Sequence, residues 1–331
     1  MNETNRYFQL PTHQELKIII EEEKMVYDRD FKTDEIIQCQ KLKIAQYWIK
    51  HRLHLLCFLT VLPFILYPLE TLKKTWITSF LGLLACCLPS GGAPIAGGII
   101  FLPSLQLIGL SSKQAVAFCT ATQSFGCGVF APLNWLDKDQ GILIKNTIPL
   151  CLLFGSFGLI FAFQNPLAEH QVGLLFACFC LFLASTVVYG LFHDLTTQNE
   201  PVKFRKITTL KGIQDYSLYI IGSLIGGMIA GWIGIGIEKI YFLLATSYHK
   251  AELRRATISA IALIGWLSSI SCLVHFFILK DVPISYWVSS LPGVLLGSIV
   301  GPIINKYLGS FNVMIIFCIF LFLNVIYEFT K

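Results

Sequence analysis

Two adjacent charged residues, Glu238 and Lys239, lie inside a long apolar stretch of this chain of 331 residues. A charge surrounded by hydrocarbon is costly, and it usually faces a cavity or a partner. Lys239 is therefore a candidate for holding an anion, and Glu238 for carrying a coupling proton. Neighbouring residues point about 100° apart on a helix, so we expect the two to be poor partners for each other. The alternative is that each side chain snorkels to the surface or pairs elsewhere.

A third titratable group, His275, lies well inside another apolar stretch. An imidazole at that depth is a candidate coupling residue in a proton relay, and a packing histidine is the alternative. Uncharged polar residues also occur in apolar stretches: Thr120, Thr122, Gln123, Ser124, Ser268, Ser269 and Ser271. Thr120, Gln123 and Ser268 are candidate substrate ligands that would complete a shell around an oxyanion. The alternative is that the hydroxyls bond to the backbone of their own helices.

Two stretches, 76–108 and 216–247, are longer than the roughly 20 residues that one membrane span needs, and glycine and proline interrupt both. Such residues break helices, so we predict two half-helices in each stretch. The N-terminus of a half-helix exposes free N–H groups, which suit an anion. Close helix packing is the alternative role of the glycines. The candidate substrate-binding glycines are Gly91, Gly92, Gly97, Gly98, Gly231, Gly234 and Gly236.

Composition places these residues in a membrane protein. Hydrophobic residues make up 55% of the chain and charged residues only 14%, where a soluble domain has about a quarter charged. Many of the charges lie in a polar tail, residues 1–52, and no signal peptide is expected before the first apolar run near Leu53. Apolar segments follow at about 53–69, 76–108, 114–135, 142–163, 171–192, 216–247, 256–279, 284–305 and 311–329.

The chain carries an internal duplication. Ser90–Ala96 parallels Ala230–Gly236, and the segment that begins at Lys113 parallels the one that begins at Arg254, with an offset near 140 residues. The predicted organisation is a tail (1–52), an extra transmembrane helix and loop (53–75), repeat one (76–192), a cytoplasmic-type loop (193–215) and repeat two (216–331).

Loop charges bear on topology, because cytoplasmic loops are enriched in Lys and Arg. If both broken segments cross the membrane, basic residues divide about evenly between the two sides. If both are re-entrant hairpins, the cytoplasmic side holds most of them. The second arrangement also makes the repeats inverted. We therefore expect an all-α polytopic membrane protein with two tandem, inverted repeats, Gly/Pro-broken re-entrant helices and about 7–9 membrane segments.

Other functional classes are disfavoured. Most of the 11 cysteines lie in apolar runs, where they behave as small hydrophobes, so no metal and no cofactor is expected. No Ser/His/Asp set or phosphate-binding loop is recognisable, so we do not expect an enzyme. Basic residues flank the apolar segments rather than forming a stripe, so no nucleic acid is expected as a partner.

The broken segments resemble those of the TauE/SafE family, the sulfite exporters and organosulfonate permeases. The resemblance covers about 76–329 and rests on Gly91, Gly97, Gly98, Pro103 and Ala115–Ala117, then on Gly231, Gly234, Gly236, Ala256, Ser259 and the Leu291-Pro292 pair. It implies a secondary transporter of small anions, such as sulfite, organosulfonates or related sulfur oxyanions, that works by alternating access. The implied partners are the lipid bilayer and a small anion.

The sequence also departs from the family pattern. Pro94 and Ala96 replace glycines in repeat one, and Ile237 and Glu238 replace the last two glycines in repeat two. A transporter retuned to another substrate would show such changes. The alternative function is a non-transporting structural subunit of a larger membrane complex, with the tail as the contact for a homo-oligomer or for other subunits.

Overall fold

The computed structural model describes residues 76–90, 97–131, 143–144, 146–196 and 212–330, together with His54, Phe58, Val61 and Ile65. Contacts divide the chain into two units, Met1–Leu53 and His54–Lys331, and the described residues belong to the second. The predictions for the polar tail, for most of the extra helix and for Gly91 and Gly92 lie outside the described residues.

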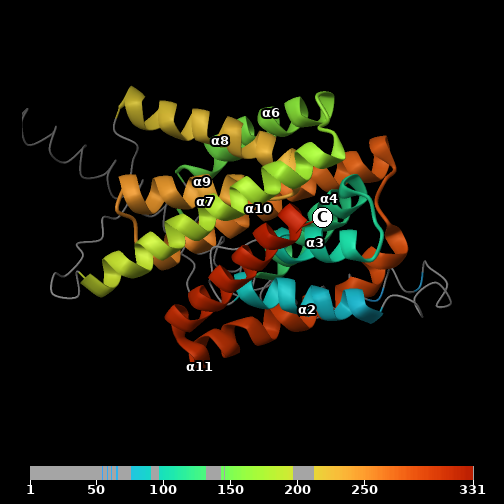
Figure 1. Ribbon diagram of the computed structural model, residues 1–331. Coiled ribbons are helices and arrows are strands. Elements are labelled where there is room, and N and C mark those ends of the chain that lie inside the picture. Colours follow the sequence, from blue (N-terminus) through green and yellow to red (C-terminus); the bar gives the residue numbers. More distant parts are fainter. Residues whose placement is uncertain are drawn as a thin grey trace, which may run out of the picture. The chain divides into compact units, whose positions relative to one another are not determined.

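All regular secondary structure in the described part of the chain is helical (Figure 1). The helices are α2 (Trp76–Ser90), α3 (Gly98–Leu107), α4 (Ser112–Phe125), α6 (Ile148–Gln164), α7 (Glu169–Thr196), α8 (Ile213–Ile233), α9 (Ile237–Leu243), α10 (Leu253–Val274) and α11 (Ile284–Thr330). Three of them continue into a π-helical segment. These are η2 (Gly126–Phe130) after α4, η3 (Leu244–Tyr248) after α9 and η4 (His275–Leu279) after α10.

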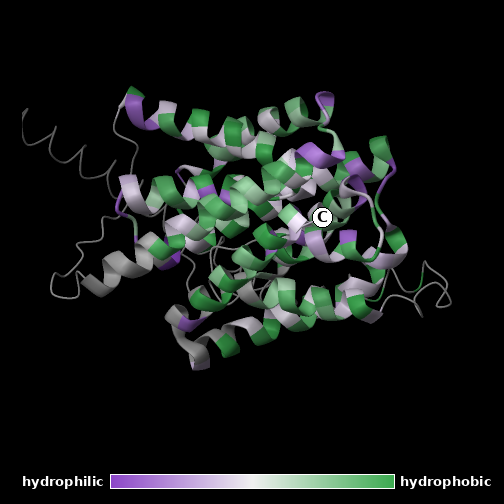
Figure 2. Ribbon diagram, viewed as in Figure 1, coloured by the Kyte–Doolittle hydropathy of each residue, from purple (hydrophilic) through white to green (hydrophobic). Residues whose placement is uncertain are grey.

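Four helical segments are long and apolar enough to cross a membrane, namely 169–188, 213–233, 254–279 and 284–301, and α2, α3, α6 and the end of α11 are shorter apolar helices. Large apolar side chains such as Phe157 of α6, Phe182 of α7 and Ile221 of α8 are exposed. Figure 2 shows hydrophobic residues along most of the ribbon. Because lipid can solvate such a surface and water cannot, the predicted multi-pass, all-α membrane protein is confirmed.

The last helix differs from the prediction. Apolar patterning predicts separate segments at 284–305 and 311–329, whereas α11 is continuous over 47 residues. Its ribbon bends sharply at the lower left of Figure 1. The first part packs on α2, and in the second part Asn324 Nδ2 donates to the carbonyl of Ile99 in α3 at 2.9 Å. The polar residues between the two apolar segments are thus part of a bent helix rather than a loop.

Glycines set the closest helix contacts. A Cβ on Gly227 of α8 would meet the backbone oxygen of Gly155 in α6. Similarly, a Cβ on Gly293 of α11 would meet the backbone oxygen of Ser79 in α2. Small residues at such contacts let backbones approach closely, which is how membrane helices associate when no hydrophobic force drives them together. The pairs α6–α8 and α2–α11 are therefore tightly packed units.

The Gly227 contact gives a stability prediction. Gly227→Ala places a methyl group against a backbone oxygen that cannot move aside, so we expect a loss of about 1–3 kcal/mol, the usual cost of overpacking. Gly222→Ala in the same helix is the matched control, because its Cβ would meet only side-chain ends of Ile240 and Leu244 at 3.0 Å. Thermal unfolding in mild detergent should show a clearly lower midpoint for Gly227→Ala. Equal midpoints for the two variants would contradict the assigned contact.

Candidate functional site

The second glycine-rich stretch is broken where the sequence predicts. Helix α8 ends at Ile233, Gly234 follows with a φ of 76°, and α9 begins at Ile237. A left-handed backbone favours glycine, which explains the residue type at position 234. In the first stretch, Gly97 precedes α3, and its carbonyl accepts the N–H of Ile100 at 3.0 Å.

The side-chain amide of Gln123 in α4 contacts both the end of α8 and helix α10. Its Nε2 donates to the carbonyl of Gly234 at 3.1 Å, and its Oε1 accepts from the hydroxyl of Ser268 at 3.0 Å. Nε2 also lies 2.9 Å from Sγ of Cys119. A Cβ on Gly98 would meet Ile235 and Cys119, so the start of α3 abuts the break between α8 and α9. The structure therefore brings together four predicted residues, Gly98, Gln123, Gly234 and Ser268.

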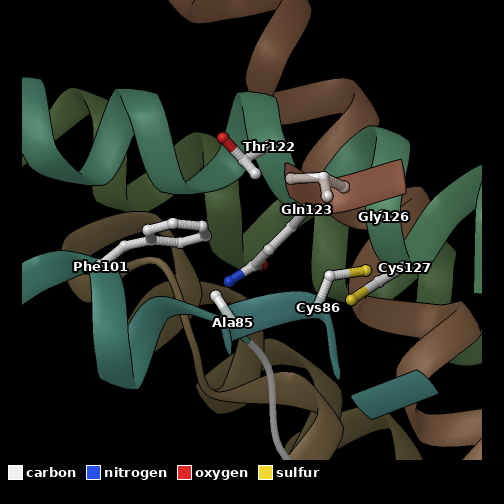
Figure 3. A pocket seen from close by; sticks show the side chains of 9 residues that line it. Ala85, Cys86, Phe101, Thr122, Gln123, Gly126 and Cys127 are labelled. Atoms are coloured by element: carbon white, nitrogen blue, oxygen red, sulfur yellow. The ribbon is translucent and has the colours of Figure 1, made fainter. Parts of the chain in front are cut away.

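A small cavity adjoins this cluster (Figure 3). Its lining includes Gly97, Cys86, Phe101, Thr122, Gln123, Gly126, Cys127 and Val294. Figure 3 shows the Gln123 side chain extending from α4 toward Ala85 of α2. The cavity measures about 10 Å³, which is room for about one water molecule. A polyatomic anion does not fit into a cavity of this size.

Thr122, the neighbour of Gln123 in α4, also lines the cavity. Thr122 is 2% exposed, and its Oγ1 has no hydrogen-bond partner within the described part of the chain. Most buried hydroxyls in membrane helices bond to their own backbone, as Thr120 does by donating to the carbonyl of Ala117 at 3.1 Å. Thr120 is therefore satisfied by its own helix, and its neighbour Thr122 retains an open hydrogen-bonding group.

Gly231 and Gly236 lie apart from the cavity lining. A Cβ on Gly231 would meet Ala162 and Leu159 of α6, so close helix packing accounts for this glycine. The N–H of Gly236 donates to Oε2 of Glu238 at 2.9 Å.

Glu238 and Lys239 are both buried, with 0% and 3% of their surfaces exposed. Nζ of Lys239 lies 3.9 Å from Oε1 of Glu238. The alternative that they snorkel to the surface is wrong, because both are buried. The expectation that they are poor partners holds only in part, because they form an ion pair, but one longer than a hydrogen bond. Glu238 lies in the first turn of α9, where its carboxylate turns back to accept the N–H of Gly236. Because of this, the second oxygen faces the Lys239 ammonium despite the angle between successive helical positions.

His275, at the start of η4, pairs with a residue that sequence reasoning missed. Its Nδ1 lies 2.8 Å from Oδ1 of Asp281, and Nζ of Lys113 lies 3.4 Å from Oδ2 of the same carboxylate. Burial opposes the charge on Asp281, but the hydrogen bond to His275 and the charge of Lys113 together hold the pKa of this carboxyl below its usual value. The network joins the beginning of α4 to the end of α10. No motif in the sequence links these three positions.

A family comparison identifies the chain. The family model described as sulfite exporter TauE/SafE matches residues 74–327. The chain belongs to this family. TauE/SafE proteins are membrane transporters and not enzymes, and membership implies an exporter of sulfite- or sulfonate-type anions. No curated protein and no solved structure matches the chain.

For this TauE/SafE protein, the Gln123 contacts give a prediction. Gln123→Leu leaves the carbonyl of Gly234 and the hydroxyl of Ser268 without their partner, and each buried unsatisfied group costs about 1–3 kcal/mol. We expect a lower unfolding midpoint in detergent than for Thr120→Val, which removes only a bond within one helix. If the two variants were equally stable, Gln123 would not hold the break in place.

The Asp281 network gives a pH-dependent prediction. A carboxyl whose pKa is lowered by folding stabilises the protein above its unfolded pKa, and this contribution is lost as the pH falls through the folded pKa. Asp281→Asn should therefore lower the unfolding midpoint by a constant amount across neutral pH, with the difference shrinking in acid. Asp215→Asn is the control, because Asp215 lies at the exposed end of α8, where it accepts from Tyr248 at 3.2 Å. A difference that grows in acid would contradict the assignment.

Proposed function

We propose that the protein is a secondary transporter that carries sulfite, organosulfonates or related sulfur oxyanions across the bilayer by alternating access. The observation that carries the proposal is the buried polar cluster at the broken helix, where Gln123 meets Gly234 and borders a cavity. Irregular backbone at membrane depth occurs where it is buried in protein or lines a cavity. Membership of the TauE/SafE family supplies the class of substrate.

Helix contacts support two inverted repeats, α2–α7 and α8–α11. Helix α2 of the first packs on α11 of the second, and α8 of the second packs on α6 of the first. Helix α4 packs on α10, and each continues into a π-helical segment. In each of these contacts a helix of one repeat packs on a helix of the other. This pattern is expected of two repeats related by a twofold axis near α4 and α10. Re-entrant half-helices, α2–α3 and α8–α9, would then approach this axis from opposite sides.

The two tightly packed helix pairs, α6–α8 and α2–α11, are the candidate rigid bodies of the transport motion. Glycine contacts hold α6 to α8 and α2 to α11, so we propose that each pair moves as one body. The hydrogen bond from Gln123 to Gly234 crosses between α4 and the end of α8. Rocking of one body against the other would lengthen this contact and widen the cavity enough for an anion. The conformation described here is then one stage of the transport cycle.

Thr122 and Gln123 are the polar groups that we assign to the anion path. In Figure 3 the hydroxyl of Thr122 points away from the amide of Gln123, so the two groups would contact the anion at different points. Both can donate hydrogen bonds, which suits the oxygens of sulfite and sulfonates alike. The N–H groups at the start of α3, beside Gly97 and Gly98, add the positive end of a helix dipole.

Flux measurements test this function. Purified protein in proteoliposomes should carry sulfite and methanesulfonate faster than empty vesicles do, and the same anions should raise its unfolding midpoint. Thr122→Val keeps the side-chain shape but removes the open hydroxyl, so we expect flux to fall about tenfold, the equivalent of one lost hydrogen bond.

Thr120→Val is the matched control in the same helix, and its flux should remain near that of the wild type. Equal flux in the two variants would remove Thr122 from the path. No flux of any anion, together with co-purification in a stable complex, would instead favour a structural subunit.

A further inference from the structure

The buried pair of Glu238 and Lys239 introduces charge into only one of the two half-helices. Helix α9 of repeat two begins with Ile237, Glu238 and Lys239, whereas helix α3 of repeat one begins with Gly98, Ile99 and Ile100. The two starting sequences correspond in the proposed repeats. Any function of the pair therefore goes beyond what the glycines of the two breaks supply.

The geometry of the pair does not favour a purely stabilising role. Nζ of Lys239 and Oε1 of Glu238 are 3.9 Å apart, and Oε1 has no hydrogen-bond partner among the described residues. Removing two charges from water costs several kcal/mol each, and only excellent geometry with further hydrogen bonds offsets that cost. Buried ionisable groups at membrane depth are functional candidates for this reason.

The surroundings connect the pair to the cavity. Glu238 accepts the N–H of Gly236, two residues after Gly234, and the carbonyl of Gly234 is held by Gln123 of the cavity lining. Within the described part of the chain, the titratable groups near the pair are the thiols of Cys119, Cys127 and Cys180 and the carboxylate of Glu328, and Cys127 also lines the cavity. An anion that enters beside Cys127 comes within the electrostatic reach of Lys239.

We propose that Glu238 and Lys239 couple the movement of each singly charged oxyanion to the movement of one proton. This rests on the transport function proposed above. In the empty site, the Glu238 carboxylate neutralises the Lys239 ammonium. When the anion enters, Glu238 takes up a proton from the same aqueous side, and Lys239 pairs with the anion instead. On the opposite side of the membrane, the anion leaves Lys239 and the proton leaves Glu238, and the ion pair of Glu238 and Lys239 forms again.

Charge balance makes this coupling obligatory. Counted over Glu238, Lys239 and the anion, the net charge is zero when the site is empty with Glu238 ionised, and again when it is loaded with Glu238 protonated. A loaded site with ionised Glu238 would carry one uncompensated negative charge, and an empty site with protonated Glu238 would carry one positive charge. Both are strongly disfavoured at low dielectric. Transport is therefore electroneutral and follows the pH gradient, and the membrane potential does not drive it.

Methanesulfonate is the probe for the test, because it stays singly charged near neutral pH and carries no proton of its own, unlike sulfite. Proteoliposomes loaded with a pH-sensitive dye report the protons that accompany its uptake. The wild type should move one proton per anion, and a potassium-diffusion potential should not change the distribution of the anion at equilibrium.

Glu238→Gln keeps Lys239 charged but cannot exchange a proton. This variant should carry methanesulfonate more slowly, because its empty site returns with an uncompensated positive charge. It should do so without protons and with a net charge, so that 100 mV shifts the equilibrium distribution of the anion roughly 50-fold. Glu252→Gln is the control, because Glu252 is an exposed carboxylate before α10. It should keep one proton per anion.

The outcomes separate the two proposals. Methanesulfonate uptake by the wild type without protons, or driven by the potential, overturns the coupling and leaves the transport function intact, and this holds even if Glu238→Gln does not fold. Proton movement that persists in Glu238→Gln also overturns it. Sulfite transport without methanesulfonate transport also overturns the coupling, because a singly charged oxyanion that brings no proton of its own is then not carried. No flux of any anion removes the transport function and the coupling together.

Discussion

A broken helix inside a bilayer must satisfy the backbone groups that the break releases, and the rest of the site depends on this constraint. At the end of α8 the task falls to Gln123, whose amide donates to the carbonyl of Gly234 and accepts from Ser268. One side chain of α4 thereby ties the break of the second repeat to α10. The same amide borders the cavity, so this contact is also one that a polar substrate can replace.

Helix packing answers a second constraint, because lipid gives no hydrophobic force between helices. The pairs α6–α8 and α2–α11 meet through Gly158, Gly227, Gly293 and Gly297, where any side chain would strike backbone atoms. Contacts of this kind are strong only at close approach, so each pair resists bending and sliding. In a transporter such stiffness is useful, since two stiff bodies confine the motion to the boundary that carries the substrate path.

The sequence predicted the features that follow from hydropathy and from the positions of glycine. Hydropathy predicted the helical membrane protein, and the glycines predicted the break at Gly234, because few other residues adopt a left-handed φ there. It could not predict contacts that depend on the tertiary fold. Asp281 is a loop carboxylate until folding places it beside Lys113 and His275. Likewise, Thr120 and Thr122 look equivalent in sequence, and only the hydrogen bonds of the folded chain distinguish them. The expectation that Glu238 and Lys239 point away from each other applies to the interior of a helix. It does not apply to the first turn, where a side chain folds back onto the free N–H groups.

The departures from the family pattern acquire a physical meaning in this light. A glycine at position 238 would remove the carboxylate that pairs with Lys239, and removing one partner of a buried charge pair is strongly destabilising. Glu238 and Lys239 therefore depend on each other, and the replacement of the glycine is better explained as one half of a charge pair than as the decay of a motif. A decayed transporter would have no reason to hold two charges in a buried position where an apolar pair would be equally or more stable. The buried pair thus argues for a working site, even though it is what makes this chain look atypical of its family.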